Sequence, residues 1–215
     1  SFIAEMNIKA FKLGMNNTTF ENPHGLNDST KNYSTAYDLS LLMKYAIKNK
    51  EFLKITSTKK HKNWYNKNEL LSDYKYLISG KIGYTTKSGP VFVSAARKNN
   101  KTLIIASINE KDKFNLHKKL YEEYFDLYDK YKILNKYTFS FKVKNNNNDH
   151  YYILKDFDML LTKNEINNLK IDVDLDNEYI LVYLSNKLVH SEKLYKLTYK
   201  SKVDKIKELL SFFKF

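Results

Sequence analysis

The sequence predicts an α+β chain in which an antiparallel sheet with helices is followed by a small all-β unit and a terminal helix. Apolar residues recur at helical spacing in residues 2–13 and again in 112–130. Two apolar strands, 91–97 and 102–108, are joined by a short Lys-Asn-Asn-Lys turn. From about residue 134 the apolar residues alternate with a period of two, which is typical of half-buried strands.

The composition excludes several classes of site. Hydrophobic residues make up 42% of the chain and charged residues 28%, which is typical of a globular protein. The chain has no cysteine, so it holds no disulfide and no thiolate metal site. The five histidines show no paired zinc-ligand spacing, and Asp172, Asp174 and Asp176 alternate with apolar residues, as on the solvent side of a strand. We therefore expect no metal and no cofactor.

The net charge of +13 narrows the choice of partners. A basic protein binds nucleic acid, an anionic membrane or an anionic cell wall. The lysines are dispersed along the chain, as the codon usage of an AT-rich genome also produces, and they form no basic stripe. We therefore expect no nucleic acid. No run reaches the roughly 18 apolar residues that a membrane span needs.

The first elements carry recognisable start and stop signals. Gly14 is expected to end the first helix, over residues 2–13. The sequence Asn-Pro-His-Gly at 22–25 predicts a turn. The Ser-Thr pair at 34–35 caps a second helix, with Asp38 at capping-box spacing. The predicted buried stripe of this helix consists of Leu39, Leu42, Met43, Ala46 and Ile47.

The pattern divides the chain into three parts. Residues 1–133 form the first domain, and residues 134–199, with several short strands, form a β-rich second domain. Residues 200–215 form a basic amphipathic helix with phenylalanines at its end. Such a helix fits an anionic membrane surface, and the alternative is a terminal helix packed on its own domain.

Three segments, in order, resemble the serine-type D-alanyl-D-alanine carboxypeptidases, which are the low-molecular-weight penicillin-binding proteins. The first runs from Leu13 to Leu26 and contains the Asn-Pro-His-Gly turn, and the second is Tyr-Ser-Thr-Ala-Tyr-Asp-Leu at 33–39. The third begins with two asparagines before Leu70-Leu71 and continues with Gly-Lys-Ile-Gly-Tyr-Thr at 80–85. Order and spacing agree from residue 1 to about 130.

The resemblance implies a penicillin-binding or β-lactamase-like transpeptidase domain, present in part, followed by a β-rich domain and a membrane-associating helix. It also implies a reaction in which a serine attacks the bond between the two terminal D-alanines of a peptidoglycan stem peptide and forms an acyl-enzyme. The implied partners are peptidoglycan stem peptides, β-lactams and an anionic membrane surface bound through 200–215. The implied location is extracytoplasmic, peripheral on the outer face of the membrane or secreted.

The family's third motif, Lys-Thr-Gly, has its counterpart at 81–83. The resemblance assigns a catalytic role to Lys81 and substrate-binding roles to Ile82, Gly83 and Thr85. Gly83 leaves the substrate backbone room to approach the strand. Ile82 replaces the threonine whose hydroxyl holds the substrate carboxylate, and isoleucine cannot donate that hydrogen bond, so we expect weakened activity.

The family's other two motifs, Ser-x-x-Lys and Ser-x-Asn, lack a well-placed counterpart. Ser57 and Ser72 begin Ser-x-x-Lys strings, and Ser107 begins Ser-x-Asn, but their positions in the chain order are wrong and we interpret them as coincidences. We expect the true motifs to precede Ser1, so that this chain is a C-terminal portion that does not catalyse alone. The alternative is a non-catalytic cell-wall or membrane-binding relative of the family.

Overall fold

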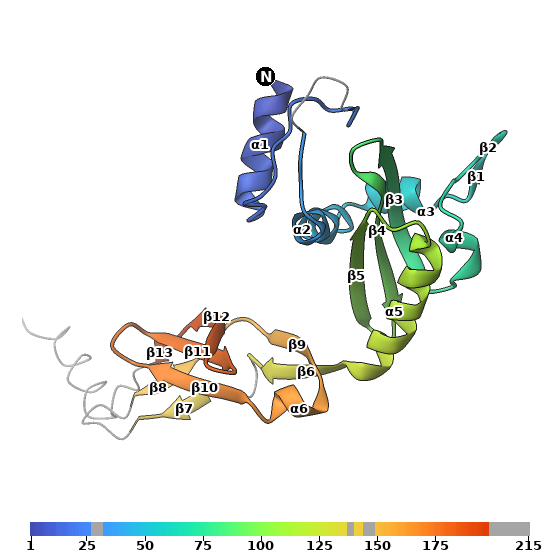
Figure 1. Cartoon of the computed structure of the whole chain (residues 1–215). Coiled ribbons are helices and arrows are strands. Elements are labelled where there is room, and N and C mark those ends of the chain that lie inside the picture. The colour runs from blue at the N-terminus through green and yellow to red at the C-terminus, as the bar shows by residue number, and fades with distance from the viewer. Residues whose placement is uncertain (27–31, 137–139, 144–148, 198–215) are drawn as a thin grey trace, which may run out of the picture. The chain divides into compact units, whose positions relative to one another are not determined.

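The structure is a computed structural model that describes residues 1–26, 32–136, 140–143 and 149–197. It divides into two compact units, Ser1–Leu127 and Tyr128–Phe215 (Figure 1). The mixed α+β class with antiparallel sheets is as predicted. The helix predicted for residues 200–215 lies outside the described residues.

The first helix ends as the sequence predicts. Helix α1 spans Phe2–Lys12, and Gly14 follows it with a φ of 76°. The amide of Met15 donates to the carbonyl of Ala10 (3.0 Å), and the amide of Gly14 donates to the carbonyl of Phe11 (3.0 Å). These two bonds form a Schellman motif, which needs a left-handed residue where Gly14 stands.

The second helix begins with half of the predicted capping box. Helix α2 spans Ala36–Ala46, and the hydroxyl of its N-cap, Thr35, accepts from the amide of Asp38. The carboxylate of Asp38 is buried and accepts instead from the amide of Asn17 (2.9 Å) and the hydroxyl of Thr18 (2.7 Å). Asp38 therefore fastens the preceding loop to the helix.

The segment between α2 and the sheet contains four short elements. A small antiparallel hairpin, β1–β2, pairs Lys60 with Tyr65 and His61 with Trp64. In Figure 1 it projects from the first unit toward the upper right. The four elements are α3 (Lys50–Ser57), β1 (Lys60–His61), β2 (Trp64–Tyr65) and α4 (Leu70–Asp73).

The predicted strands form one antiparallel sheet in the order β3-β4-β5. The connection between β4 and β5 is the predicted tight turn, because Asn99 (φ 51°) and Asn100 (φ 60°) both adopt the left-handed conformation of a type I′ hairpin. The three strands are β3 (Leu77–Thr85), β4 (Gly89–Lys98) and β5 (Lys101–Ile108).

Helices cover both faces of this sheet. Alternate residues of a strand point to opposite faces, and β4 places Val93 and Ala95 against α2 but Phe92 and Ala96 against α4 and the long helix α5 (Lys113–Leu127). The α2 face also receives Phe52 from α3. The core on the α5 face consists of Leu70, Leu71, Tyr74, Leu77, Phe92, Ala96, Tyr121 and Phe125.

The prediction of a helix over 112–130 extends a few residues beyond the end of the observed helix. Helix α5 ends at Leu127, and the chain enters strand β6 (Asp129–Leu134). Strand β6 pairs with β9 (Phe157–Leu161) and buries Leu134 completely. Pairing with a distant strand and burial of Leu134 therefore outweigh the local helical pattern, and the second unit begins at Tyr128.

The described residues of the second unit form three small antiparallel sheets, β6-β9, β13-β8-β7 and β10-β11-β12. Their shared core contains Leu134, Tyr151, Ile153, Ile180, Val182 and Leu194. The elements not yet given are β7 (Ser140–Lys142), β8 (His150–Tyr152), α6 (Lys163–Ile166), β10 (Leu169–Asp174), β11 (Tyr179–Leu184), β12 (Lys187–Lys193) and β13 (Tyr195–Leu197).

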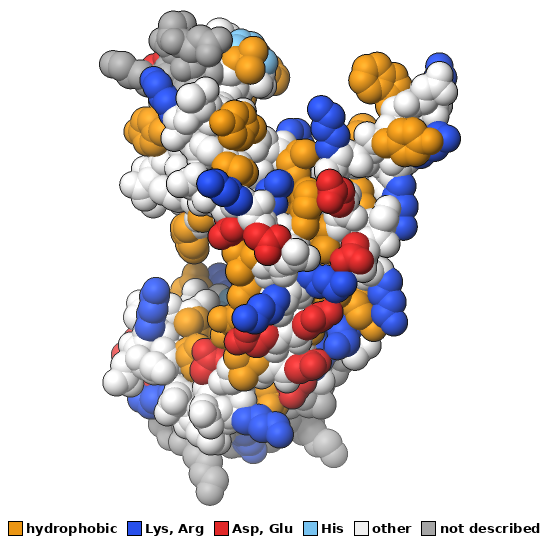
Figure 2. Space-filling model, turned by 45° about the vertical axis from the view of Figure 1, so that its right-hand side comes forward, with side chains coloured by type: hydrophobic (Ala, Val, Ile, Leu, Met, Phe, Trp, Pro, Cys, Tyr) orange, Lys and Arg blue, Asp and Glu red, His pale blue; other side chains and the backbone are white. Residues whose placement is uncertain are grey.

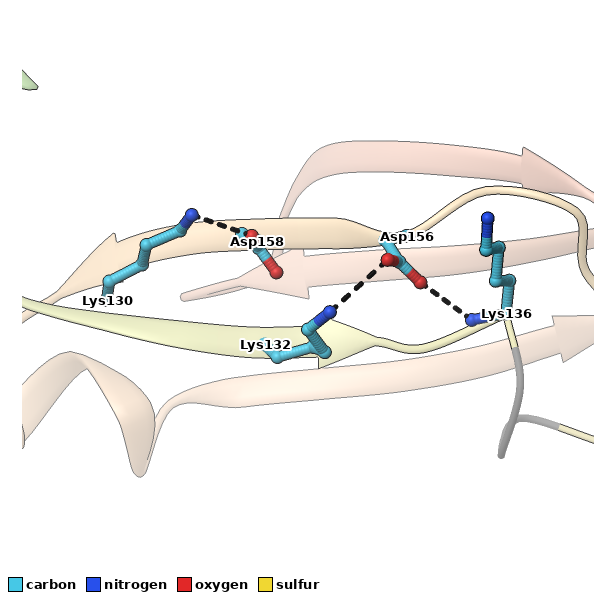
Figure 3. Close-up of polar contacts among 5 residues, drawn as sticks. All are labelled: Lys130, Lys132, Lys136, Asp156 and Asp158. Carbon is cyan, nitrogen blue, oxygen red and sulfur yellow. Dashed lines mark hydrogen bonds and ion pairs between the residues drawn. The ribbon is translucent and has the colours of Figure 1, made fainter. Parts of the chain in front are cut away.

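Ion pairs line the outside of the β6-β9 ribbon (Figure 3). Lys130 pairs with Asp158 (2.9 Å) and Lys132 with Asp156 (3.2 Å). Asp156 also accepts from the backbone amide of Lys136 (2.9 Å), and this hydrogen bond is the main reason that the pKa of its carboxyl is lowered. Because exposed pairs contribute little, the ribbon depends chiefly on its buried face.

Candidate active site

The stretch that carries the Lys-x-Gly sequence lies on β3, at the edge of the described sheet. Lys81 stands opposite Val93 and Gly83 opposite Val91, so both face the α2 side. Ile82 stands opposite Phe92 and packs against the core on the α5 side. The isoleucine therefore contributes to the fold on the face away from the lysine.

Two adjoining cavities meet at this edge. An apolar cavity of about 360 Å³ lies between α2 and β3, and a more polar one of about 620 Å³ lies between the loop after α1 and the end of β3. Lys81 and Gly83 line both of them. The apolar cavity is lined further by Leu39, Leu42, Met43, Ala46, Phe52, Ile82, Val91 and Val93.

The polar cavity carries positive charge. Lys81 and Lys87 line it, together with His24, and no carboxylate is among its described lining residues. The exposed side chain of Lys81 donates to the carbonyl of Ile82 and has no ion-pair partner that neutralises it among the described residues. The cavity is thus suited to a ligand with a carboxylate.

The Asn-Pro-His-Gly turn forms one wall of the polar cavity. The side chain of Asn22 accepts from the amide of Gly25 (2.8 Å) and donates to the carbonyl of Leu26 (2.9 Å). Nδ1 of His24 accepts from the amide of Leu26 (3.1 Å), so this imidazole helps to shape the turn. Asn22 is buried, so its hydrogen bonds are shielded from solvent.

Gly83 and Thr85 lie along the same face of β3. A Cβ atom placed on Gly83 would meet only the Cβ of Val91, at 4.0 Å, so the fold itself does not require glycine here. The hydroxyl of Thr85 accepts from the amide of Ser88 (3.0 Å) and lies 2.7 Å from the hydroxyl of Ser88. Thr85 therefore shapes the β3–β4 turn and presents its hydroxyl at the cavity wall.

Sequence reasoning missed a close contact that fixes the start of this stretch. Asn68 is buried, and its amide lies where a Cβ on Gly80 would stand, with Nδ2 only 2.4 Å from that position. Neither polar atom of the Asn68 amide has a hydrogen-bond partner in the described protein. Gly80 is thus required by packing, whereas Gly83 is not.

Sequence reasoning also missed a buried polar cluster on the α5 face. His117 is fully buried; its Nδ1 lies 2.8 Å from the hydroxyl of Ser94 and its Nε2 lies 2.9 Å from that of Ser107. The Ser94 hydroxyl also lies 2.7 Å from that of Tyr121. Burial lowers the pKa of His117 to about 4. The only sequence signal was the place of His117 on an apolar helix face.

The three serine strings lie away from both cavities. Ser57 ends α3 and Ser72 lies on α4, both exposed, and Ser107 is engaged by His117. The serines that do line the polar cavity, Ser34 and Ser88, have no lysine three residues later. Among the described residues, no group of three acidic or histidine side chains is arranged to hold a metal.

Comparison with known proteins identifies the family. The sequence model of the D-alanyl-D-alanine carboxypeptidase family, peptidase family S11, matches residues 1–112, which include the whole of the cavity-lining segment. The chain therefore belongs to the D-alanyl-D-alanine carboxypeptidase family.

Curated relatives show the same match. The D-alanyl-D-alanine carboxypeptidase DacF of Bacillus subtilis is 34% identical over 108 residues, covering 46% of this chain and 28% of the relative. DacC of Escherichia coli is 38% identical over 134 residues, covering 56% of this chain and 32% of the relative. The chain thus spans well under half the length of these relatives.

Solved structures extend the likeness to the second unit. Penicillin binding protein 5 from Haemophilus influenzae superposes with a TM-score of 0.73, covering 92% of this chain and 65% of that one at 24% identity, which speaks for the fold alone. The D-alanyl-D-alanine carboxypeptidase from Mycobacterium tuberculosis covers 58% of this chain and 53% of that one at 30% identity, with a TM-score of 0.53.

Proposed function

We propose that this chain is part of a serine-type D-Ala-D-Ala carboxypeptidase that trims peptidoglycan stem peptides through an acyl-enzyme. The observation that carries the proposal is the cationic polar cavity at the edge of β3, in a chain of this family. A stem peptide ends in a carboxylate and an extended backbone, and an edge strand pairs with extended backbone. The same cavity would take β-lactams.

Three residues between positions 81 and 85 have proposed roles. Lys81 attracts the terminal carboxylate and assists proton movement at the serine. Gly83 lets the substrate backbone approach β3, since the fold has room for a side chain there that the protein leaves unused. Thr85 presents a hydroxyl to the substrate at the end of the strand.

The nucleophile is not among the serines of the described cavity, so we propose that this chain alone does not catalyse. A second candidate function, a non-catalytic cell-wall or membrane-binding relative, is favoured by the isoleucine at position 82. None of the described helices is both long and apolar enough to span a membrane. We propose an extracytoplasmic location, peripheral on the membrane or secreted.

Labelling with a fluorescent penicillin tests the proposal. The complete gene product should become covalently labelled, and the label should survive denaturation because an acyl-enzyme is an ester. A Lys81→Ala variant should lose labelling while keeping the circular dichroism of the parent, since its side chain is exposed. A folded gene product that takes no label would favour the non-catalytic relative instead.

A further inference from the structure

The β1–β2 hairpin presents two large aromatic rings to solvent. Trp64 is 79% exposed and Tyr65 is 70% exposed. Neither ring belongs to a core cluster of the first unit. A strand of two residues gains little from its own pairing, so the exposed rings are the hairpin's most distinctive feature.

The hairpin is nevertheless held firmly at its base. The side-chain amide of Asn66 donates to the carbonyl of Thr58 (3.0 Å) and lies 3.4 Å from that of Thr56, at the end of α3. The backbone amide of Asn66 donates to the carbonyl of Lys59 (2.9 Å), and Asn68 donates its amide to the Asn66 side chain (3.0 Å). The rings therefore stand on an anchored support.

The surroundings of the rings are basic. Four lysines and one histidine lie between Thr58 and Asn68, and this stretch contains no aspartate or glutamate. The ammonium of Lys60 lies 4.8 Å from the centre of the Tyr65 ring. Figure 2 shows hydrophobic and basic side chains together over this projection. Charge complementarity therefore points to an anionic partner.

The shape of the hairpin favours an anionic polymer over an anionic membrane as the partner. Its tip consists of Lys62, with a φ of 52°, and Asn63, both polar. Neighbouring strand residues point to opposite faces, so Trp64 and Tyr65 stand on the two sides behind the tip. Entry into a bilayer would bury a charged tip first, which is costly. A polymer lying alongside would meet a flat ring and lysines together.

We propose that the hairpin from Thr58 to Asn66 binds a polysaccharide that carries carboxylates, of the kind found in peptidoglycan. A sugar ring would stack on Trp64 or on Tyr65, whichever stands on the side along which the polymer lies, and lysines would pair with the carboxylates. The choice of polymer rests on the proposed function. In Figure 1 the hairpin stands toward the end of the sheet where the β3–β4 turn lies, and Thr85, Lys87 and Ser88 at that turn line the polar cavity.

Trp64 is the only tryptophan of the chain, so its emission reports directly on the hairpin. We would titrate the full chain with soluble peptidoglycan strands from which an amidase has removed the stem peptides. Such strands keep the carboxylates of the sugar backbone but carry no D-Ala-D-Ala. The proposal predicts saturable quenching or a blue shift that weakens with added salt.

Variants are compared by co-sedimentation with insoluble peptidoglycan. The double substitution Trp64→Ala with Tyr65→Ala should weaken binding about tenfold. The control is Tyr37→Ala, which removes an equally exposed ring (70%) outside both cavities and should bind as the parent does. Lys60→Gln with Lys62→Gln should weaken binding and reduce its salt dependence.

Two results would overturn the proposal. One is equal sedimentation of the aromatic double variant and the parent. The other is a change in Trp64 emission with vesicles of anionic phospholipid and none with the polysaccharide, which would assign the hairpin to a membrane. Because the stripped strands are not substrates, a failed penicillin label would refute the proposed function and leave these binding results intact.

Discussion

His117 joins three elements of the first unit through one buried imidazole. Its ring contacts Ser94 on β4 and Ser107 on β5, and it stacks on Phe92 with 4.4 Å between ring centres. Burial lowers the pKa of this imidazole to about 4, against the ordinary 6.5. The ring is thus held neutral in the folded protein at neutral pH.

This pKa predicts that stability falls in mild acid. The unfolded chain takes up a proton near pH 6.5 and the folded chain only near 4, so protonation favours unfolding. The stabilisation is complete above about pH 6.5 and declines as the pH falls toward 4, by about 3 kcal/mol. Urea unfolding of the parent and of His117→Gln over this range measures it.

The comparison isolates the histidine from the carboxylates, which contribute their own acid dependence. The His117→Gln variant should be less stable at neutral pH and should lose less stability on acidification than the parent. His61→Gln, at an exposed position, is the control and should follow the parent. Parallel curves for His117→Gln and the parent would contradict the assignment.

Ile82 supports a second prediction at the scale of a residue. Its side chain packs against the core on the α5 side, so Ile82→Thr should lower the free energy of unfolding by about 1 kcal/mol. The family resemblance predicts that the same change raises the rate of penicillin labelling of the complete gene product, whereas the position of this side chain on the face away from Lys81 predicts no change. An unchanged labelling rate would refute this explanation of weakened activity.

At the scale of the element, the β4–β5 turn has a strict conformational demand. Asn99 and Asn100 both have positive φ, which asparagine tolerates and β-branched residues do not. Asn100→Val should lower the free energy of unfolding by about 1–2 kcal/mol. Asn100→Gly should change it by less than about 0.5 kcal/mol, since glycine adopts this conformation without strain. Thermal unfolding distinguishes the two variants.

Strand β3 carries two glycines with different requirements. Gly80→Ala would place a Cβ 2.4 Å from the Asn68 amide, so it should lower the melting temperature. Gly83→Ala meets nothing closer than 4.0 Å and should leave the melting temperature nearly unchanged. If substrate approaches at Gly83, this variant should still lose penicillin labelling on the order of tenfold. Normal labelling of Gly83→Ala would remove Gly83 from the site.

At the scale of the whole molecule, the sequence predicted those turns and helix ends that depend on a few neighbouring residues. The Asn-Asn turn, the Gly14 helix end and the Thr35 cap are confirmed because each depends on a few neighbouring residues. The predicted C-terminal end of α5 was wrong because the residues that follow Leu127 form β6, which pairs with the distant strand β9. The His117 cluster was missed because α5 must first be placed on the sheet before its burial is visible.

The candidate site also depends on contacts between segments that are distant in the sequence. The polar cavity is lined mainly by the segment between α1 and α2, which includes the loop at 22–26, and by the end of β3, about sixty residues later in the chain. The resemblance assigned site roles only to residues between 81 and 85, and it did not predict that the loop at 22–26 lines the same cavity. Composition and periodicity carried no such signal, because the cavity arises from how a loop and a strand are placed in space.

The two units have separate cores, so a core substitution should destabilise mainly the unit that contains it. Phe92 is buried in the first unit and Ile180 in the second. Phe92→Ala should cost about 3–5 kcal/mol and Ile180→Ala about 2–5 kcal/mol. Hydrogen exchange followed by mass spectrometry should show faster exchange in the strands of the substituted unit. Equal acceleration in both units would show that they unfold together.

The imidazole of His117 also gives its hydrogen bonds a direction. With the proton on Nδ1, Ser94 accepts from the ring and Ser107 donates to Nε2; with the proton on Nε2, both serines exchange roles. The orientation of the Tyr121 hydroxyl, beside Ser94, follows from this choice. The tautomer of His117 thus sets the direction of the hydrogen bonds among four side chains. The nitrogen-15 chemical shifts of this one ring would identify the tautomer and with it those directions.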